Sequence, residues 1–110
     1  MAVDENLANR VRTFFESIPN VEEKKMFGGL CYMVSRHMCC GILNDTLMAR
    51  VGPDQYEVCL QKEHARKMDF TGRVMKGMVY IDSPGVEAES DLSAWINICL
   101  KFINTLPPKK

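Results

Sequence analysis

Net charge is the first thing this sequence lacks. Its 14 lysine and arginine residues balance 14 aspartate and glutamate residues over a length of 110 residues. A protein with no excess of either sign creates no overall field that attracts a polyanion, although a local basic patch would still be compatible with this balance. We therefore do not expect direct binding of nucleic acid.

Long apolar runs are missing as well. No segment approaches the run of about 18 apolar residues that spans a membrane, and the acidic start of the chain has no apolar signal core. Apolar residues still make up 46% of the sequence, which is enough for one hydrophobic core in a chain of this length. We expect a cytoplasmic protein, not bound to a membrane, that folds as one domain over residues 1–110.

The sequence contains no CxxC pair, and its cysteines are odd in number. The five are Cys31, Cys39, Cys40, Cys59 and Cys99. An odd count, mostly within apolar runs, fits buried reduced thiols better than a disulfide framework.

A metal site is the alternative interpretation of these cysteines. In a regular strand His37 and Cys39 would point to one face and Cys40 to the other, and Cys31 on a neighbouring strand would add a third ligand. A structural zinc site needs four ligands, usually in paired spacings, so buried thiols are favoured. No nucleophile motif surrounds His37 or His64, and we expect no metal, no other cofactor and no catalytic residues.

Three segments have the spacing of helices. The first runs from about 4 to 17, with Asp4 as N-cap, and the second from about 53 to 62, opened by Gly52-Pro53-Asp54. The third runs from about 90 to 106, with Ser90 as N-cap and a Pro-Pro pair after it. Each has apolar residues at three- and four-residue intervals, which predicts one buried face.

Four segments are predicted as strands, at about 26–34, 37–43, 46–51 and 74–82. The two-residue breaks Ser35-Arg36 and Asn44-Asp45 predict successive hairpins, and residues 63–71 are predicted as a loop containing Met68 and Phe70. The order α-βββ-α-β-α predicts a two-layer α+β domain with helices on an antiparallel sheet. The pair Gly28-Gly29 predicts a bulge, a bend or a close backbone approach, and it resembles a phosphate-binding loop only faintly.

Methionine is frequent in the predicted sheet. Four of the eight methionines fall in its first three strands: Met26, Met33, Met38 and Met48. Methionine fills irregular gaps in a core and also serves adaptable binding surfaces. Core packing is the favoured interpretation.

Three basic residues form the candidate binding site: Arg50, Arg73 and Lys76. Alternation along the predicted strands places Arg50 opposite Leu47, Ala49 and Val51, away from the core, and Lys76 away from its apolar neighbours too. Together they would bind an anion or an acidic partner. A solvated sheet face is the favoured alternative, as are ion pairs with Asp45, Asp69 and Asp82.

Five short motifs follow one another along the chain: Lys25–Gly29, Met38–Gly41, Leu47–Gly52, Met68–Arg73 and Met75–Gly77. In these motifs and their order, the chain resembles the N-terminal domain of the TfoX (Sxy) family. The Trp95 helix, which ends in Leu106-Pro107-Pro108-Lys109, is similar too. The resemblance covers nearly the whole chain, and the order of the motifs is more specific than any one of them.

This resemblance implies a two-layer fold like that of type III secretion chaperones, which often pair as dimers. It also implies a link to the regulation of competence genes, where the full-length regulator acts with a cyclic-AMP-dependent activator. The family carries no agreed catalytic residues. We expect the helical C-terminal domain of the full-length regulator to be absent from this chain.

The leading hypothesis is a non-enzymatic cytoplasmic regulatory or protein-interaction module. We expect it to form a homodimer and to bind a protein partner whose identity the residues do not indicate. The alternative is a small-anion-binding protein or an enzyme that uses Arg50, Arg73 and Lys76. A nucleic-acid-associated regulator is a third hypothesis, which rests on family analogy alone.

Overall fold

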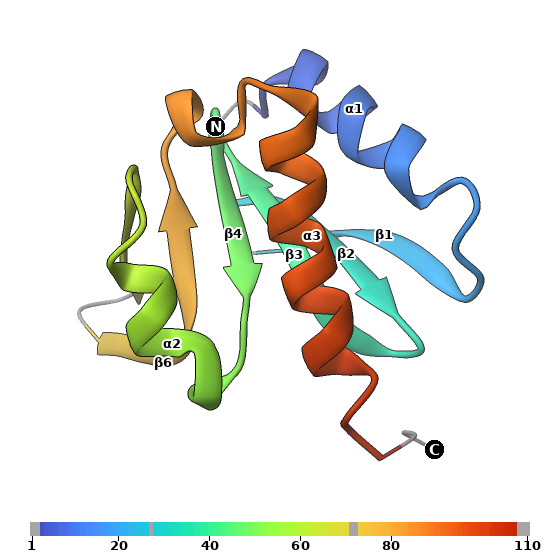
Figure 1. Ribbon diagram of the computed structural model, residues 1–110. Coiled ribbons are helices and arrows are strands. Elements are labelled where there is room, and N and C mark those ends of the chain that lie inside the picture. The colour runs from blue at the N-terminus through green and yellow to red at the C-terminus, as the bar shows by residue number, and fades with distance from the viewer. Residues whose placement is uncertain (1–2, 27, 71–72, 108–110) are drawn as a thin grey trace.

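Helices and strands of this chain form two layers. The computed structural model describes residues 3–26, 28–70 and 73–107, and side-chain positions at 26, 69–70 and 73–76 lie outside that description. In this part of the chain a six-stranded antiparallel sheet has the order β1-β2-β3-β4-β6-β5 (Figure 1). Its strands are β1 Val21–Met26, β2 Gly29–Val34, β3 His37–Leu43, β4 Thr46–Arg50, β5 Ala65–Phe70 and β6 Arg73–Ile81. The predicted α+β class is confirmed.

The described part of the chain has three α-helices, and they pack on one face of the sheet. They are α1 Glu5–Phe15, α2 Pro53–Leu60 and α3 Glu89–Ile103, and a short 3-10 helix, η1 Ser83–Val86, precedes the last. All three contribute to one core cluster with the central strands, and α3 crosses in front of β3 and β4 (Figure 1). None of the helices that the structure describes has the length and apolar character needed to cross a membrane.

The first helix begins as its sequence predicts. The Asp4 carboxylate accepts hydrogen bonds from the backbone N–H groups of Asn6 and Leu7, at 2.9 and 3.2 Å. These bonds satisfy donors that an α-helix leaves unpaired at its start. At the other end of α1, the Phe15 ring stacks on Tyr32 of β2 with 5.7 Å between ring centroids, so this end of the helix packs on the sheet.

The last helix begins two residues earlier than predicted. Its N-cap is Ala88 and not Ser90, and the Ala88 carbonyl accepts the N–H groups of Asp91 and Leu92. The acidic residues Glu89 and Asp91 then lie in the first turn, where the helix dipole favours negative charge. The electrostatic benefit of this turn replaces the side-chain cap that Ser90 was expected to supply.

Two edge strands were not predicted. All the predicted elements occur in the predicted order, but β1 precedes the first predicted strand and β5 occupies the segment expected to be a loop. Neither β1 (Val-Glu-Glu-Lys-Lys-Met) nor the start of β5 (Ala-Arg-Lys) has an apolar alternation that marks a strand. Their strand conformation is set by pairing with β2 and β6, and their charges suit the exposed edges of a sheet.

The glycine pair lies at the turn between β1 and β2. Gly28 has a positive φ of 78°, and a Cβ on Gly29 would collide with the Ile42 carbonyl of β3. The close backbone approach predicted for this pair is therefore confirmed. Phe27, which precedes it, lies outside the described residues.

Candidate functional site

A β-bulge in β3 turns two neighbouring cysteines toward the helices. Tyr32 of β2 pairs with Cys40 and Met33 pairs with Met38, so Cys39 has no partner residue on β2. A bulge breaks the alternation of the strand, and both Cys39 and Cys40 belong to the core that the helices cover. The prediction that these two side chains point to opposite faces is wrong for this reason.

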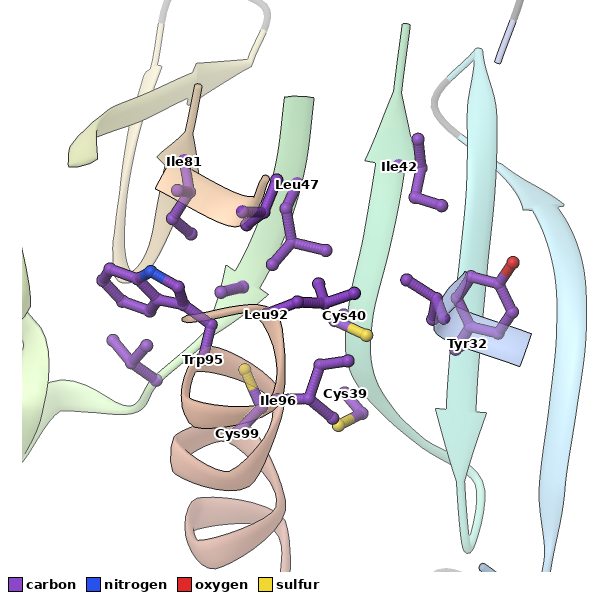
Figure 2. Close-up of a cluster of buried hydrophobic side chains, with 14 of the residues drawn as sticks. Tyr32, Cys39, Cys40, Ile42, Leu47, Ile81, Leu92, Trp95, Ile96 and Cys99 are labelled. Atoms are coloured by element: carbon purple, nitrogen blue, oxygen red, sulfur yellow. The ribbon is translucent and has the colours of Figure 1, made fainter. Parts of the chain in front are cut away.

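Cys99 of α3 completes a cluster of three thiols, which we call the thiol cluster. Cys39, Cys40 and Cys99 are all fully buried and reduced. Figure 2 shows them in the layer of side chains between β3 and α3, near Ile96 and Leu92.

The three thiols differ in their tendency to ionise. Hydrogen bonds from Cys40 and Cys99, together with the nearby charge of Arg50, hold the pKa of Cys39 well below the usual thiol value. The pKa values of Cys40 and Cys99 are raised, because each donates to Cys39 and is cut off from water. Of the three thiols, Cys39 therefore ionises most readily.

The metal-ligand set considered from the sequence is not assembled. Cys31 belongs to a second cluster on the opposite face of the sheet from Cys39. His37 lies with its Nε2 2.8 Å from the carbonyl oxygen of Pro107, to which it donates a hydrogen bond. Within the described residues, no group of three or more histidine, cysteine, aspartate or glutamate residues could hold a metal ion.

Arg50 connects the sheet to α3. Its guanidinium lies 5.3 Å from the centroid of the Phe102 ring, and its Nη1 donates a 3.3 Å hydrogen bond to the Met38 carbonyl. The sequence predicted that this side chain points away from the core, but β4 ends at Arg50, so the long side chain is free to leave the alternation of the strand. Among the described carboxylates, none forms an ion pair with it.

The other two basic residues of the predicted site lie in β6. The pairing register sets Arg50 opposite Met78, which is two residues from Lys76 and five from Arg73 along the strand. Five residues of strand span roughly 16 Å, so the register separates Arg73 from Arg50 far more than Lys76. The side chains of Arg73 and Lys76 lie outside the described residues, and the three-residue site stays a prediction.

The ion pairs proposed as the alternative partners differ from those observed. Asp82 pairs with Arg66 of β5, with 2.8 Å between Nη2 and Oδ1. This pair joins the sheet edge to the start of η1, and it holds the pKa of Asp82 below its usual value.

A groove of about 500 Å³ lies beside the Phe102 ring. Its apolar lining comes from Val51, Ile98 and Phe102, and its rim carries Asp54 and Lys101. It runs between the start of α2 and the second half of α3.

The opposite face of the sheet is covered by none of the described helices. It carries a second apolar cluster, which we call the methionine face: Cys31, Met48, Met68, Met78 and Tyr80, with Met38 and Leu43 half-buried beside them. Met33 shares this face because it pairs with Met38, and it too is half-buried. The Met26 side chain lies outside the described residues.

The methionine face was only partly foreseen. The sequence favoured core packing, which holds for the fully buried Met48, whereas Met33 and Met38 are only half-buried. The sequence signal for this face was the lack of alternation in the apolar runs of β2 and β3. Strands that are buried on both sides have such runs, and both strands are almost continuously buried.

These features define a small α+β module with a thiol cluster under α3 and a methionine face on the other side of its sheet. The family model of the TfoX N-terminal domain matches residues 13–103, so the chain belongs to this family. No curated protein and no solved structure matches the chain. The likeness to type III secretion chaperones therefore stays a prediction.

Proposed function

We propose that this protein is a non-enzymatic, cytoplasmic regulatory module that works as a homodimer, with the methionine face as the contact between two copies. The observation that carries the proposal is the apolar character of a sheet face on which the described helices do not pack. Membership of the TfoX N-terminal domain family, associated with the regulation of competence for DNA uptake, supports a regulatory role.

The edges of the sheet do not favour a dimer formed by strand addition. The outer strand β1 carries Glu22, Glu23, Lys24 and Lys25 in succession, and β5 carries Arg66 and Lys67. Charged edge strands oppose pairing with another chain. A contact between two copies is therefore expected on the face of the sheet.

A second copy suits the methionine face in both apolar character and charge. Flexible methionines adapt to a partner surface, and Met33, Met38 and Leu43 still expose part of their apolar area. The register puts Glu22 and Lys24 at one side of this face and Arg66 at the other, so its rim carries both signs. In a two-fold dimer the same patch meets itself, and a rim of mixed sign allows favourable pairs.

Light scattering coupled to gel filtration tests the dimer. The wild-type protein should have twice the chain mass of 12.5 kDa at micromolar concentration. Met38→Lys should give the monomer mass with an unchanged circular dichroism spectrum, because a lysine within the contact would be desolvated. Val58→Lys is the matched control, since Val58 is exposed on α2, and it should leave the dimer intact. A wild-type monomer would contradict the proposal.

The regulatory action is proposed to pass through a protein partner. The balanced charge of the chain gives no field for duplex DNA. Fluorescence anisotropy at low ionic strength should show no binding to duplex or single-stranded DNA. Binding that weakens steeply with added salt would overturn this part of the proposal.

Binding of a small anion is the second candidate function. It is favoured by the Arg50 guanidinium, whose recorded partners are a carbonyl oxygen and an aromatic ring. If Arg50, Arg73 and Lys76 form a site, inorganic phosphate should raise the melting temperature of the wild type, and Arg50→Ala with Lys76→Ala should abolish the shift. Lys62→Ala is the control for general charge effects. Equal shifts in all variants would remove this candidate.

A further inference from the structure

The groove between α2 and α3 is not used by the proposed dimer. Its walls belong to the two helices that pack on one face of the sheet, whereas the methionine face lies on the other (Figure 1). Its volume of about 500 Å³ is in the range of established binding sites, and Val51, Ile98 and Phe102 give it an apolar lining. The dimer would therefore leave this groove open to a different molecule.

The apolar surface of the groove follows both helices. On α3, Ile98 and Phe102 are four residues apart and Thr105 follows at the next turn, so this wall runs roughly 10 Å along the helix axis. On α2, Val58 lies one turn beyond Asp54 on the same side of the helix. Val58 is 57% exposed, and no other large apolar side chain among the described residues is called exposed. The apolar surface thus continues past the groove along α2.

The rim of the groove carries one charge of each sign. Asp54 lies in the first turn of α2 and Lys101 in the last turn of α3, and both are exposed. Among the described residues, neither has a partner in an ion pair or a side-chain hydrogen bond. Both charges are therefore available to an occupant that carries the opposite signs at its two sides.

We propose that this groove binds a short amphipathic helix of a protein partner. Apolar side chains at positions i and i+4 of that helix would contact Ile98 and Phe102, with a basic residue beside Asp54 and an acidic residue beside Lys101. The inference rests on the proposed function as a protein-interaction module, and it adds the site and the kind of partner. A helix presents charged residues on both sides of an apolar stripe, which is the pattern that the groove complements.

Other modes of peptide recognition fit the groove less well. An extended peptide pairs with a strand edge, but the described lining comes from two helices and from Val51, which follows the end of β4. A proline-rich peptide needs a groove lined by aromatic rings, and Phe102 is the single ring in the described lining. A phosphopeptide needs a cluster of arginines, whereas the described lining has Lys101 together with the acidic Asp54.

A phage-displayed library of single-helix peptides, randomised along one helix face, tests the proposal against the full chain. Enriched peptides should share apolar residues at i and i+4, a base on one flank and an acid on the other. A fluorescein-labelled synthetic copy of an enriched peptide should then bind in a fluorescence anisotropy titration. Absence of any enriched peptide, or enrichment of peptides without the two flanking charges, would overturn the proposal.

Two matched pairs of variants place the peptide in the groove. Ile98→Ala should weaken binding about tenfold, whereas Leu100→Ala, a half-buried residue of α3 outside the described lining, should leave it unchanged. Lys101→Glu should weaken binding about two- to fivefold and should prefer a peptide whose acid is replaced by lysine. Lys67→Glu, the same charge change on β5, should have neither effect. Equal losses within either pair would show that the peptide binds elsewhere.

Two further variants separate the groove from the dimer. Val58→Lys should weaken peptide binding and keep the dimer mass, and Met38→Lys should give a monomer that binds the peptide as tightly as the wild type. A wild-type monomer that binds the peptide would contradict the dimer alone. A wild-type dimer that binds no peptide would contradict the groove alone.

Discussion

Gly52 shows how one residue shapes the part of the fold around Arg50, Phe102 and the groove. Its φ of 88° and ψ of 160° lie in a region that only glycine adopts without strain. A Cβ at this position would also collide with the Phe102 ring, the same ring that stacks on Arg50 and lines the groove. The packing of Phe102 therefore depends on the absence of a side chain at residue 52.

Gly52→Ala should lower the free energy of unfolding by about 2–4 kcal/mol, from backbone strain and from the displaced ring. Urea unfolding followed by circular dichroism gives this value. Introducing the same change into Phe102→Ala separates the two causes. The loss should be smaller in that background, and an equal loss would show that the ring plays no part.

At the scale of elements, the turn between β2 and β3 has the right geometry but unusual residues. Ser35 and Arg36 both have positive φ, 51° and 70°, as a tight two-residue hairpin requires. Residues other than glycine, asparagine and aspartate pay for this conformation with steric strain. Pairing of β2 with β3 imposes the turn in spite of its sequence.

Arg36→Gly should relieve part of this strain and raise the free energy of unfolding by about 0.5–1 kcal/mol, net of the added freedom of the unfolded chain. Thermal and urea unfolding measure the change. Arg36→Ala is the matched control, because it removes the same exposed side chain but keeps a Cβ, and it should give no gain. A gain of equal size from alanine would refute the strain argument.

The N-cap of α1 gives a second test at this scale. Asp4→Ala removes both hydrogen bonds to the first turn and should cost about 1 kcal/mol in urea unfolding. Asp4→Ser should retain most of the stability, since serine caps helices as well. A loss of the same size for serine would mean that the charge of Asp4, and not its cap, stabilises the helix.

The sequence predicted those elements whose own residues carry the signal. The apolar stripes of α1 and α3 and the apolar runs of β2, β3, β4 and β6 mark them directly. The edge strands β1 and β5 could not be found this way, because their pairing partners fix their conformation. The grouping of the cysteines could not be predicted for a similar reason. The bulge at Cys39 arises from the pairing between β2 and β3, and it turns the Cys39 side chain to the face opposite to the one that alternation predicts.

At the scale of the whole molecule, ion pairs attach α1 to the edge strand β1 and to the start of α3. Arg12 of α1 binds both carboxylate oxygens of Glu23 on β1, at 2.7 and 2.9 Å. Arg10 of α1 contacts Glu89 at the start of α3 at 2.5 Å and donates to the Val86 carbonyl of η1. The charged residues of β1 and β5 made these strands hard to predict from sequence. In the structure, Glu23 of β1 and Arg66 of β5 form ion pairs that attach the edge strands to the rest of the fold.

Acid should weaken the attachment of β1. Arg12 holds the pKa of Glu23 below its usual value, so the folded state binds a proton at this group less readily than the unfolded state. The stabilisation is present above the unfolded pKa near 4.5 and is lost as pH falls through the lower folded pKa. Glu23→Gln should therefore melt below the wild type at pH 7, and the difference should shrink toward pH 3. Glu16→Gln, at an exposed position near the end of α1, is the control, and a Glu23→Gln difference independent of pH would contradict this assignment.

The most direct test of the central claim, that two copies meet through the methionine face, is an isotope-filtered nuclear Overhauser experiment on a mixed sample. One half of the protein carries ¹³C-methyl methionine, and the other half is unlabelled. Contacts between copies should appear from the methyl groups of Met33 and Met38, and they should vanish in Met38→Lys. Absence of intermolecular contacts at these methyl groups, in a sample that light scattering shows to be dimeric, would place the interface elsewhere and contradict the account.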